Sequence, residues 1–433
     1  MKRIALALVC AAALWPAAAN AQFVPVNTAG GTFPGSPNYP THVIVMIQEN
    51  RTPDNLFQTM APFGADIQNF GINSSNAVVP LVSGPLNAPG DLGHAHNDFV
   101  VDYNGGLNNG WDIDNAGNGA YNFVQASDVV PYTNAAHTYS FFDETTQTGQ
   151  SPSFPAHLYL AAASAGYPLS LQRNLPSITG TGCQAALTSG QTTQAIDESN
   201  LNQGPFGTVL DSTVPLRASS CANITTVFDL LNSHGKSWKY YRDADDFAYW
   251  DIPGIFAQFY FSPYYLTNES IPETNILTDI AAGNLANVSY VIPSKENSDH
   301  PGVDTGSGPA WVQSVVNAVG ASPQLWYNTT ILIVWDDWGG EYDHVKPQPP
   351  QGRANDPGQF GYRVPLIAIS PYVIPHCISH KRRDYSAIIT FIETTQGLGQ
   401  LGGTLQMDGY NGGPPGLDDC FNWTGAPRPF TSI

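Results

Sequence analysis

Two uninterrupted apolar runs, far apart in the chain, each lead into the same kind of polar sequence. The run Ile331–Val334 is followed by WDDWGGEYDH at positions 335–344, and Val43–Ile47 is followed by QENRTPDNLF at positions 48–57. Short continuous apolar runs predict strands that are buried on both faces, as in a parallel sheet covered by helices. The chain is therefore expected to fold as an α/β protein with these two strands in its core.

Oxygen-bearing side chains follow each of these strands directly. They are Glu49 and Asn50 after the first strand, and Asp336 and Asp337 after the second. Ligands of α/β sheets bind at the carboxyl ends of the strands. Adjacent carboxylates repel each other unless a cation or a shared proton compensates, and oxygen ligands suit a hard divalent cation. A polar turn explains either segment alone, but together they favour a metal-assisted hydrolase whose strands are parallel neighbours.

Other segments support this fold class. Strands are predicted at 289–293 and 364–370, and helices at 156–165, 223–234 and 385–394. Helices that alternate with strands indicate a mostly parallel sheet. The stretch 63–121 is rich in Asn, Gly and Pro and predicts a long loop system, which in a compact enzyme usually carries function. Residues 167–222 are expected to form a loop-rich insertion in a single catalytic domain, 22–433.

The first residues, 1–21, have the pattern of a secretion signal. Lys2 and Arg3 precede the apolar run Ile4–Leu14, and Ala19–Ala21 fits a cleavage site of small residues. The apolar run is too short to span a bilayer. We therefore expect a secreted or periplasmic protein that begins near Gln22 and has no stable membrane insertion.

The cysteines indicate the compartment of the protein, and the net charge excludes one class of partner. Of five cysteines, Cys10 lies in the signal, and an even remainder in an exported protein favours disulfides. Three connectivities are open, of which we prefer Cys183–Cys221 with Cys377–Cys420. The formal net charge of −19 argues against nucleic acid as a partner, because phosphate backbones need clustered basic residues.

The chain resembles the phosphoesterase family that contains bacterial acid phosphatases and non-haemolytic phospholipases C. The resemblance extends over nearly the whole mature chain. It rests on landmarks in the family's order, namely 42–57, DLGH at 91–94, 149–157, DHP at 299–301, 336–345, and GYRVP at 361–365 with ISP at 369–371. It implies a three-layer sandwich with a mostly parallel central sheet flanked by helices, similar to the alkaline phosphatase superfamily.

The resemblance also implies a mechanism. Members of the family use a metal-bound Ser or Thr as nucleophile, and the matching segment here is GQSPSFPAH at 149–157. Ser153 fits the family pattern best, while Ser151 is the alternative. The implied ligands of one divalent metal ion, whose identity stays open, are Glu49, Asn50, Ser153, Asp336 and Asp337. A phosphoserine intermediate follows from this arrangement.

Histidines supply the positive charge that phosphate needs in this acidic chain. His300 and His94 match family positions that contact phosphate, with His96 as the alternative to His94 and Asn50 as a further substrate ligand. A protonated histidine requires a pH near or below its pKa of about 6.5, which fits an acidic optimum. Asp343, His344 and His157 are expected to support the metal ligands, and Arg51 with Asp54 is interpreted as a pair that braces the loop after the first strand.

Three functions are compatible with the sequence. The first is a secreted acid phosphatase or broad phosphoesterase acting on small phosphate esters. The second is a phospholipase C acting on phosphatidylcholine-like lipids. The third, an exported ligand- or surface-binding protein without catalysis, would require lost ligands, yet every expected oxygen ligand is present.

Overall fold

The computed structural model describes residues 38–114, 117–150, 152–164, 194–196, 213–215, 224–244, 250–347, 360–401 and 416–433. The predicted signal 1–21, Ser151 and the predicted Cys183–Cys221 pair lie outside these residues. Of the predicted insertion 167–222, only two antiparallel strands are described, β7 (Gln194–Ile196) and β8 (Thr213–Pro215). The predicted domain bounds therefore stay a prediction.

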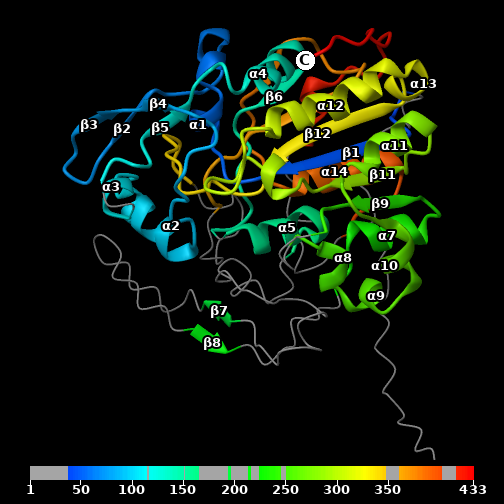
Figure 1. Ribbon diagram of the computed structural model, residues 1–433, viewed down its shortest axis with the longest axis horizontal. Coiled ribbons are helices and arrows are strands. Elements are labelled where there is room, and N and C mark those ends of the chain that lie inside the picture. Colours follow the sequence, from blue (N-terminus) through cyan, green and yellow to red (C-terminus); the bar gives the residue numbers. More distant parts are fainter. Residues whose placement is uncertain are drawn as a thin grey trace, which may run out of the picture. The chain divides into compact units, whose positions relative to one another are not determined.

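An eight-stranded sheet forms the centre of the fold (Figure 1). Its strands all pair in parallel, except that β13 is antiparallel to both of its neighbours. In spatial order they are β10 (Glu269–Ser270), β9 (Trp238–Tyr241), β11 (Val288–Val291), β1 (His42–Gln48), β12 (Thr329–Trp335), β13 (Leu366–Ile369), β6 (Ser140–Phe142) and β14 (Cys377–Ser379). The mostly parallel α/β sheet predicted from the sequence is confirmed.

The two apolar runs of the sequence are the central pair of this sheet. β1 and β12 are parallel neighbours, with Val43 opposite Thr330 and Gln48 opposite Trp335. All residues of β12 are buried, because helices cover both faces of the sheet and leave no solvent-facing side. The register brings both strands to an end at the same level, so the polar residues that follow them start side by side.

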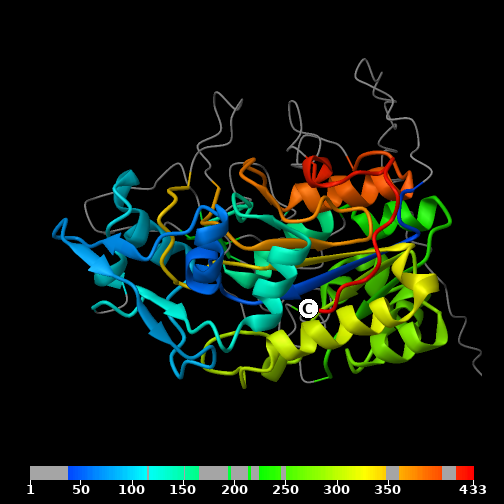
Figure 2. The same ribbon diagram turned by 90° about the horizontal axis from the view of Figure 1, so that it is seen from above.

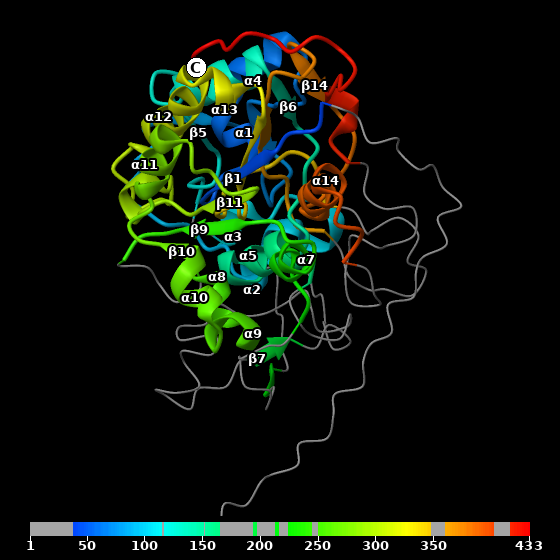
Figure 3. The same cartoon turned by 90° about the vertical axis from the view of Figure 1, so that its right-hand side faces the viewer.

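Helices form the two outer layers (Figure 2). α4 (Val130–Thr138), α11 (Asn275–Ala282) and α12 (Gly308–Ala321) lie on one face, and α5 (Ser153–Ala162), α7 (Val227–Ser233) and α14 (Ser386–Gln396) lie on the other (Figure 3). The predicted helix at 156–165 begins earlier than expected, at Ser153. The three-layer arrangement is the one that the sequence predicted.

The predicted loop system 63–121 contains short regular elements. Beyond the carboxyl end of β12, aromatic side chains of this region form a second apolar cluster with Trp338, Tyr342 and Tyr362. The elements are β2 (Phe70–Ile72), β3 (Val78–Pro80), β4 (Val82–Gly84), α2 (His96–Tyr103), η2 (Asn104–Gly106) and α3 (Trp111–Asp114), and β4 pairs with β5 (Asn122–Val124). This cluster anchors the segment after β12.

The remaining elements are short. They are α1 (Pro53–Leu56), η1 (Gln58–Phe63), α8 (Ile252–Ile255), α9 (Ala257–Tyr260), α10 (Pro263–Asn268), η4 (Lys295–Asn297), α13 (Pro323–Trp326) and η5 (Asp418–Cys420). The predicted disulfide between Cys377 and Cys420 is present. Among the helices that the structure describes, none combines the length and the apolar character that a bilayer crossing requires.

Candidate active site

The segments after β1 and β12 are joined to each other residue by residue. The N–H of Asp336 donates to the carbonyl of Gln48 at 2.9 Å, and the N–H of Arg51 donates to the carbonyl of Asp337 at 3.0 Å. Between them, the N–H of Asn50 donates to Oδ1 of Asp336 at 3.0 Å. The hydrogen-bond ladder thus continues beyond the strands, and it fixes the four predicted oxygen ligands beside one another.

This close approach depends on two special backbone positions. Asn50 has a φ of 62°, in the left-handed region that Asn tolerates better than most residues. Gly339 faces it with the same φ, and a Cβ at this glycine would lie 2.4 Å from the Asn50 carbonyl oxygen. Gly339 therefore makes room for the ligand-bearing turn after β1.

A buried cluster of acids and one histidine lies at the ends of the strands. Candidate ligand atoms of Glu49, His157 and Asp336 all lie within 4.8 Å of one another. Nε2 of His157 is 3.3 Å from Glu49 Oε1 and 3.5 Å from Asp336 Oδ2. His157, expected only to support the ligands, touches two of them directly from the first turns of α5.

Ser153 joins this cluster from the start of α5. Its hydroxyl donates to Oδ2 of Asp337 at 3.1 Å. Ser153 is nearly buried and lines a cavity of about 390 Å³. A hydroxyl held by a carboxylate at the wall of a cavity is placed as a nucleophile is in covalent catalysis.

The oxygen atoms left over in the cluster fit a hard cation. Glu49 Oε2, Asn50 Oδ1 and Asp336 Oδ2 are buried and have no hydrogen-bond partner among the described residues. A buried polar atom without a partner is costly, and a charged one more so. Carboxylate and amide oxygens are the ligands that Mg²⁺ and Ca²⁺ take in proteins. The residues present therefore fit the predicted divalent metal ion.

The pKa values show the same excess of negative charge. Burial and the neighbouring Asp336 raise the pKa of Glu49 well above its usual range, and the same causes raise the pKa of Asp337 to about 8. Although burial opposes it, the nearby imidazole of His157 lowers the pKa of Asp336 to about 2. The protein groups alone thus do not keep all three acids ionised, so a proton or a cation must complete the site.

Two of the predicted phosphate ligands lie at the same cavity as Ser153. His94 and His300 both line it, and their ring centroids are 6.0 Å apart. Nδ1 of His94 donates to the Leu92 carbonyl at 2.7 Å, and its Nε2 is 3.3 Å from Asn50 Nδ2. Burial opposes protonation, but the charges of Asp337 and Asp91 raise the pKa of His94. His94 therefore stays protonated to a higher pH than an ordinary histidine.

Asp343 and His344 belong to a different network in the part of the chain that the structure describes. Arg363 donates to Asp343 Oδ1 at 2.7 Å, and His344 Nδ1 is 2.7 Å from Asp54 Oδ2. The interpretation of Arg51 and Asp54 as a pair is wrong, because Arg51 contacts Glu341 at 3.3 Å instead. These buried pairs brace the loops after β1 and β12 from behind the ligands.

Sequence reasoning missed one support of the site and could not place two alternatives. The Tyr385 hydroxyl lies within hydrogen-bond distance of the carbonyls of Trp335 and Asp336, which share its one proton. This contact between distant segments leaves no local pattern. Ser151 lies outside the described residues, and so does the side chain of His96, whose backbone begins α2. The choice between each of them and its competitor stays open.

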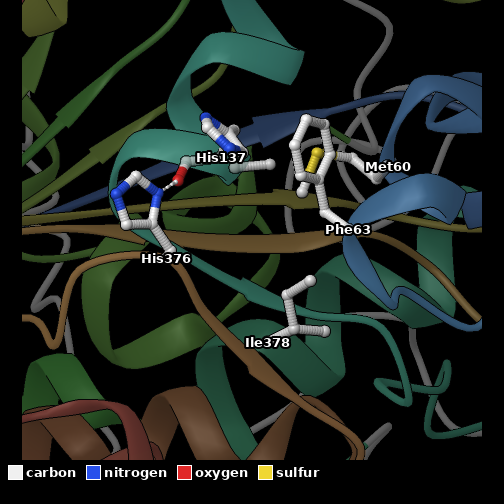
Figure 4. Close-up of a pocket in the computed structure, with 6 residues that line it drawn as sticks. Met60, Phe63, His137, His376 and Ile378 are labelled. Carbon is white, nitrogen blue, oxygen red and sulfur yellow. Dashed lines mark hydrogen bonds between the residues drawn. The ribbon is translucent and has the colours of Figure 1, made fainter.

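A second cavity, of about 350 Å³, lies between η1, α4 and β14 (Figure 4). Met60, Phe63, His137, His376 and Ile378 line it, and the imidazole of His376 donates to the carbonyl of His137. Its lining offers neither a carboxylate nor a hydroxyl nucleophile. The cavity beside Ser153 is therefore the candidate active site.

Comparison with known proteins finds sequences similar to this chain. A family described as the phosphoesterase family matches residues 41–399. Phospholipase C A of Mycobacterium tuberculosis is 23% identical over 452 residues, which cover 92% of this chain and 80% of that protein. A non-hemolytic phospholipase C of Pseudomonas aeruginosa is 28% identical over 211 residues, and non-specific phospholipase C1 of Arabidopsis thaliana is 32% identical over 181. Those two matches cover 40% and 36% of this chain, but only 30% and 31% of the relatives.

Two solved structures are similar to this chain at low sequence identity. A protein in the alkaline phosphatase superfamily from Vibrio parahaemolyticus is 10% identical, with a TM-score of 0.35 over 82% of this chain and 68% of that one. A 2-O GAG sulfatase is 10% identical, with a TM-score of 0.37 over 84% and 71%.

Proposed function

Because the chain belongs to the phosphoesterase family, we propose that it is a secreted, metal-dependent acid phosphatase or broad phosphoesterase acting through a phosphoserine. The observation that carries the proposal is the contact of Ser153 with Asp337 in a cavity that His94 and His300 also line. Nucleophile, proton acceptor and anion ligands thus meet at one place. The proposal includes removal of residues 1–21 on export.

The substrate phosphate is held by donors that converge on the cavity. Asn50 Nδ2 and His94 Nε2 lie close together and offer two N–H groups once His94 is protonated. The first N–H groups of α5 add the positive end of a helix dipole at Ser153. The raised pKa of His94 extends the pH range over which this anion site is positive, and protonation at acidic pH supports an acidic optimum.

Glu49, Asn50, Asp336, Asp337 and Ser153 would hold the divalent cation. When bound, the cation offsets the charge of the carboxylates and lowers the pKa of a neighbouring hydroxyl. Ionised Asp337 then accepts the Ser153 proton at Oδ2, to which the hydroxyl already points.

The reaction proceeds by two displacements at phosphorus. Ser153 Oγ forms a bond to phosphorus while the bond to the ester oxygen breaks, and a protonated histidine, His300 or His94, gives a proton to the departing alcohol. Water then attacks the phosphoserine, and inorganic phosphate leaves as the Ser153 hydroxyl is restored. His157 holds Glu49 and Asp336 in place throughout.

A phospholipase C is the second candidate. Its support is the name of the relatives, which are phospholipases C, and the apolar wall that Leu92 and Phe154 add to the cavity. An apolar wall suits the diacylglycerol leaving group of a phospholipid, whereas a small phosphomonoester needs only the polar end.

A substrate panel tests and separates these candidates. Purified protein is assayed with a phosphomonoester, a phosphodiester and phosphatidylcholine vesicles. Each assay is run from roughly pH 4 to pH 9, which reports acid–base catalysis, and with and without a chelator, which reports metal dependence. Turnover of the monoester that falls with chelation supports the first candidate. Release of phosphocholine alone supports the second. No turnover, with phosphate still bound, would leave a binding protein.

A further inference from the structure

A buried carboxylate that the proposed mechanism does not use lies behind the site. Asp299 is fully buried between β11 and the cavity residue His300. Its Oδ2 accepts hydrogen bonds from the Tyr132 hydroxyl at 2.8 Å and from the Trp335 indole N–H at 3.1 Å. Trp335 is the last residue of β12 and directly precedes Asp336. One oxygen atom of Asp299 thus links α4 with the end of a ligand-bearing strand.

The same network reaches the other ligand-bearing strand. Gln48 is the last residue of β1 and directly precedes Glu49. Its amide donates to the Tyr132 hydroxyl at 2.9 Å, so Tyr132 bridges Gln48 and Asp299. The amide also donates to the Asn297 carbonyl at 2.9 Å. The ends of β1 and β12 are therefore both tied to the loop that carries His300.

The main chain around Asp299 adds further ties. Its carbonyl accepts two hydrogen bonds from the Arg51 guanidinium, at 3.1 Å and 2.8 Å. The N–H of Glu49 donates to the carbonyl of the preceding Ser298 at 2.8 Å. Asp299 itself has a φ of 70°, a conformation that only surrounding contacts keep in place. Its side-chain and main-chain bonds together set the direction in which the chain turns into His300.

The carboxylate has no room to move. A Cβ at Gly308, the first residue of α12, would lie 1.9 Å from Asp299 Oδ1. The absence of a side chain at Gly308 lets the carboxylate sit against the start of this helix, whose dipole favours a negative charge. Packing, charge and hydrogen bonds therefore all hold Asp299 in one orientation.

We infer that Asp299 is a positioning residue, which through Tyr132 and Trp335 holds the two ligand-bearing strand ends and His300 in one fixed arrangement. The effect on catalysis rests on the proposed function, whereas the positioning of the strand ends and of His300 does not. It assigns a role to the acid of the Asp-His-Pro sequence, where the His alone faces the cavity.

Three variants test the inference. Asp299→Ala removes both acceptors, and Asp299→Asn keeps one oxygen that can accept from Tyr132 and Trp335. Tyr132→Phe removes the bridge between Gln48 and Asp299 and leaves the hydrogen bond from Trp335 in place. We expect Asp299→Ala to lose about tenfold to a hundredfold in kcat/KM for a phosphomonoester, as when partners that orient a site are removed. Inorganic phosphate should bind less tightly in proportion, and Asp299→Asn should recover most of both losses.

A matched control separates positioning from general destabilisation. Asp251 is also buried, and it accepts hydrogen bonds from Gly254 and Tyr265, neither of which is a proposed ligand. Asp251→Ala should lower the melting temperature but leave kcat/KM and phosphate affinity unchanged when assayed where the protein is folded. Equal losses in Asp251→Ala and Asp299→Ala would overturn the inference.

Amide hydrogen exchange gives a readout that needs no activity. The amides of Glu49, Asp336 and His300 are hydrogen-bonded to Ser298 and Gln48 in the native protein. Asp299→Ala should speed exchange in all three segments, and Asp251→Ala in none. Wild-type protein without turnover would refute the proposed function and not this inference, whereas unchanged exchange in Asp299→Ala would refute the inference whatever the activity.

Discussion

The N–H of Asn50 lies 3.0 Å from Oδ1 of Asp336 and donates to it across the boundary between two neighbouring strands. The other oxygen of this carboxylate has no hydrogen-bond partner among the described residues. Asp336 thus uses one oxygen to hold the turn after β1 and keeps the second for the site. The fold and the proposed metal site meet in this one side chain.

The first prediction is that Asp336→Asn loses the divalent metal ion. The amide can still accept from Asn50, but it removes a negative charge and places an N–H₂ group where a ligand oxygen should be. We expect roughly a hundredfold weaker metal binding or more, with a matching loss of turnover and little change in melting temperature. Metal content after dialysis and a thermal melt measure both effects.

The control for this variant removes an acid elsewhere. Asp112 binds the Ser74 main chain and hydroxyl near α3, so Asp112→Asn should keep its metal and its turnover. If Asp336→Asn retained the wild-type metal stoichiometry and near-normal turnover, the proposed ligand set would be wrong.

The second prediction concerns the close approach of Gly339 to Asn50. A Cβ at position 339 would lie 2.4 Å from the Asn50 carbonyl oxygen, at a φ of 62°. Gly339→Ala should therefore combine backbone strain of about 1–2 kcal/mol with displacement of the ligand turn, and it should lower both the melting temperature and kcat. The displacement acts on Asn50, which we propose as a metal and phosphate ligand.

A substitution at Gly397 serves as the control, because it introduces the same backbone strain without displacing a ligand-bearing turn. Gly397 has a φ of 67° at the end of α14, and a Cβ there would meet no atom within 4 Å. Gly397→Ala should cost a similar strain and leave kcat unchanged. An equal fall in kcat for both variants would mean that the close contact at Gly339 has no special role.

The third prediction is a pH-dependent stability from His344. Burial opposes its protonation, but the hydrogen bond with Asp54 raises the pKa of His344 above its ordinary value of about 6.5. A folded-state pKa above the unfolded one gives stability that is complete below about pH 6.5 and is lost as the pH rises through the folded value. His344→Gln should therefore cost about 1.5 kcal/mol at pH 6 and less at pH 9.

Urea unfolding of both proteins at pH 6, 7, 8 and 9 measures this difference. His234 provides the control. It is the exposed residue directly after α7 and is hydrogen-bonded to that helix, and no ion pair with an acid is found for it among the described residues. A difference between His344→Gln and wild type that stays constant across this range, or that grows with pH, would contradict the assignment.

Much of the fold could be predicted because local hydrophobic patterns in the sequence indicate its strands and helices. The apolar runs of β1 and β12 have no solvent face, so they predict buried strands, and the polar residues that follow are expected at one edge of the sheet if the strands are parallel neighbours. The loop system before Tyr121 was harder, because β2, β3 and β4 are short strands that tertiary contacts stabilise. The strand propensity of the local sequence does not predict such short strands.

The site was predictable where its residues follow strands and unpredictable where they meet through packing. Glu49 and Asp336 directly follow apolar runs, so the sequence alone indicates them as candidate ligands. His157 was expected near the site, but its contact with both acids depends on how α5 docks on the sheet. Asp343 next to Arg363 could not be told from a ligand support, because the partner lies in a separate landmark and only the fold brings the two together.

The last prediction identifies the nucleophile. Ser153→Ala removes the hydroxyl that donates to Asp337, so turnover should fall by at least about a thousandfold, as when a covalent nucleophile is deleted. Bound metal and melting temperature should change little, because the carboxylate ligands remain. A labelled phosphomonoester, quenched in acid, should leave phosphoserine on the peptide that contains Ser153 in the wild type and none in the variant. Ser151→Ala is the matched control and should keep both turnover and labelling; the reverse pattern would move the role to Ser151, and full activity in both variants would favour direct attack by water.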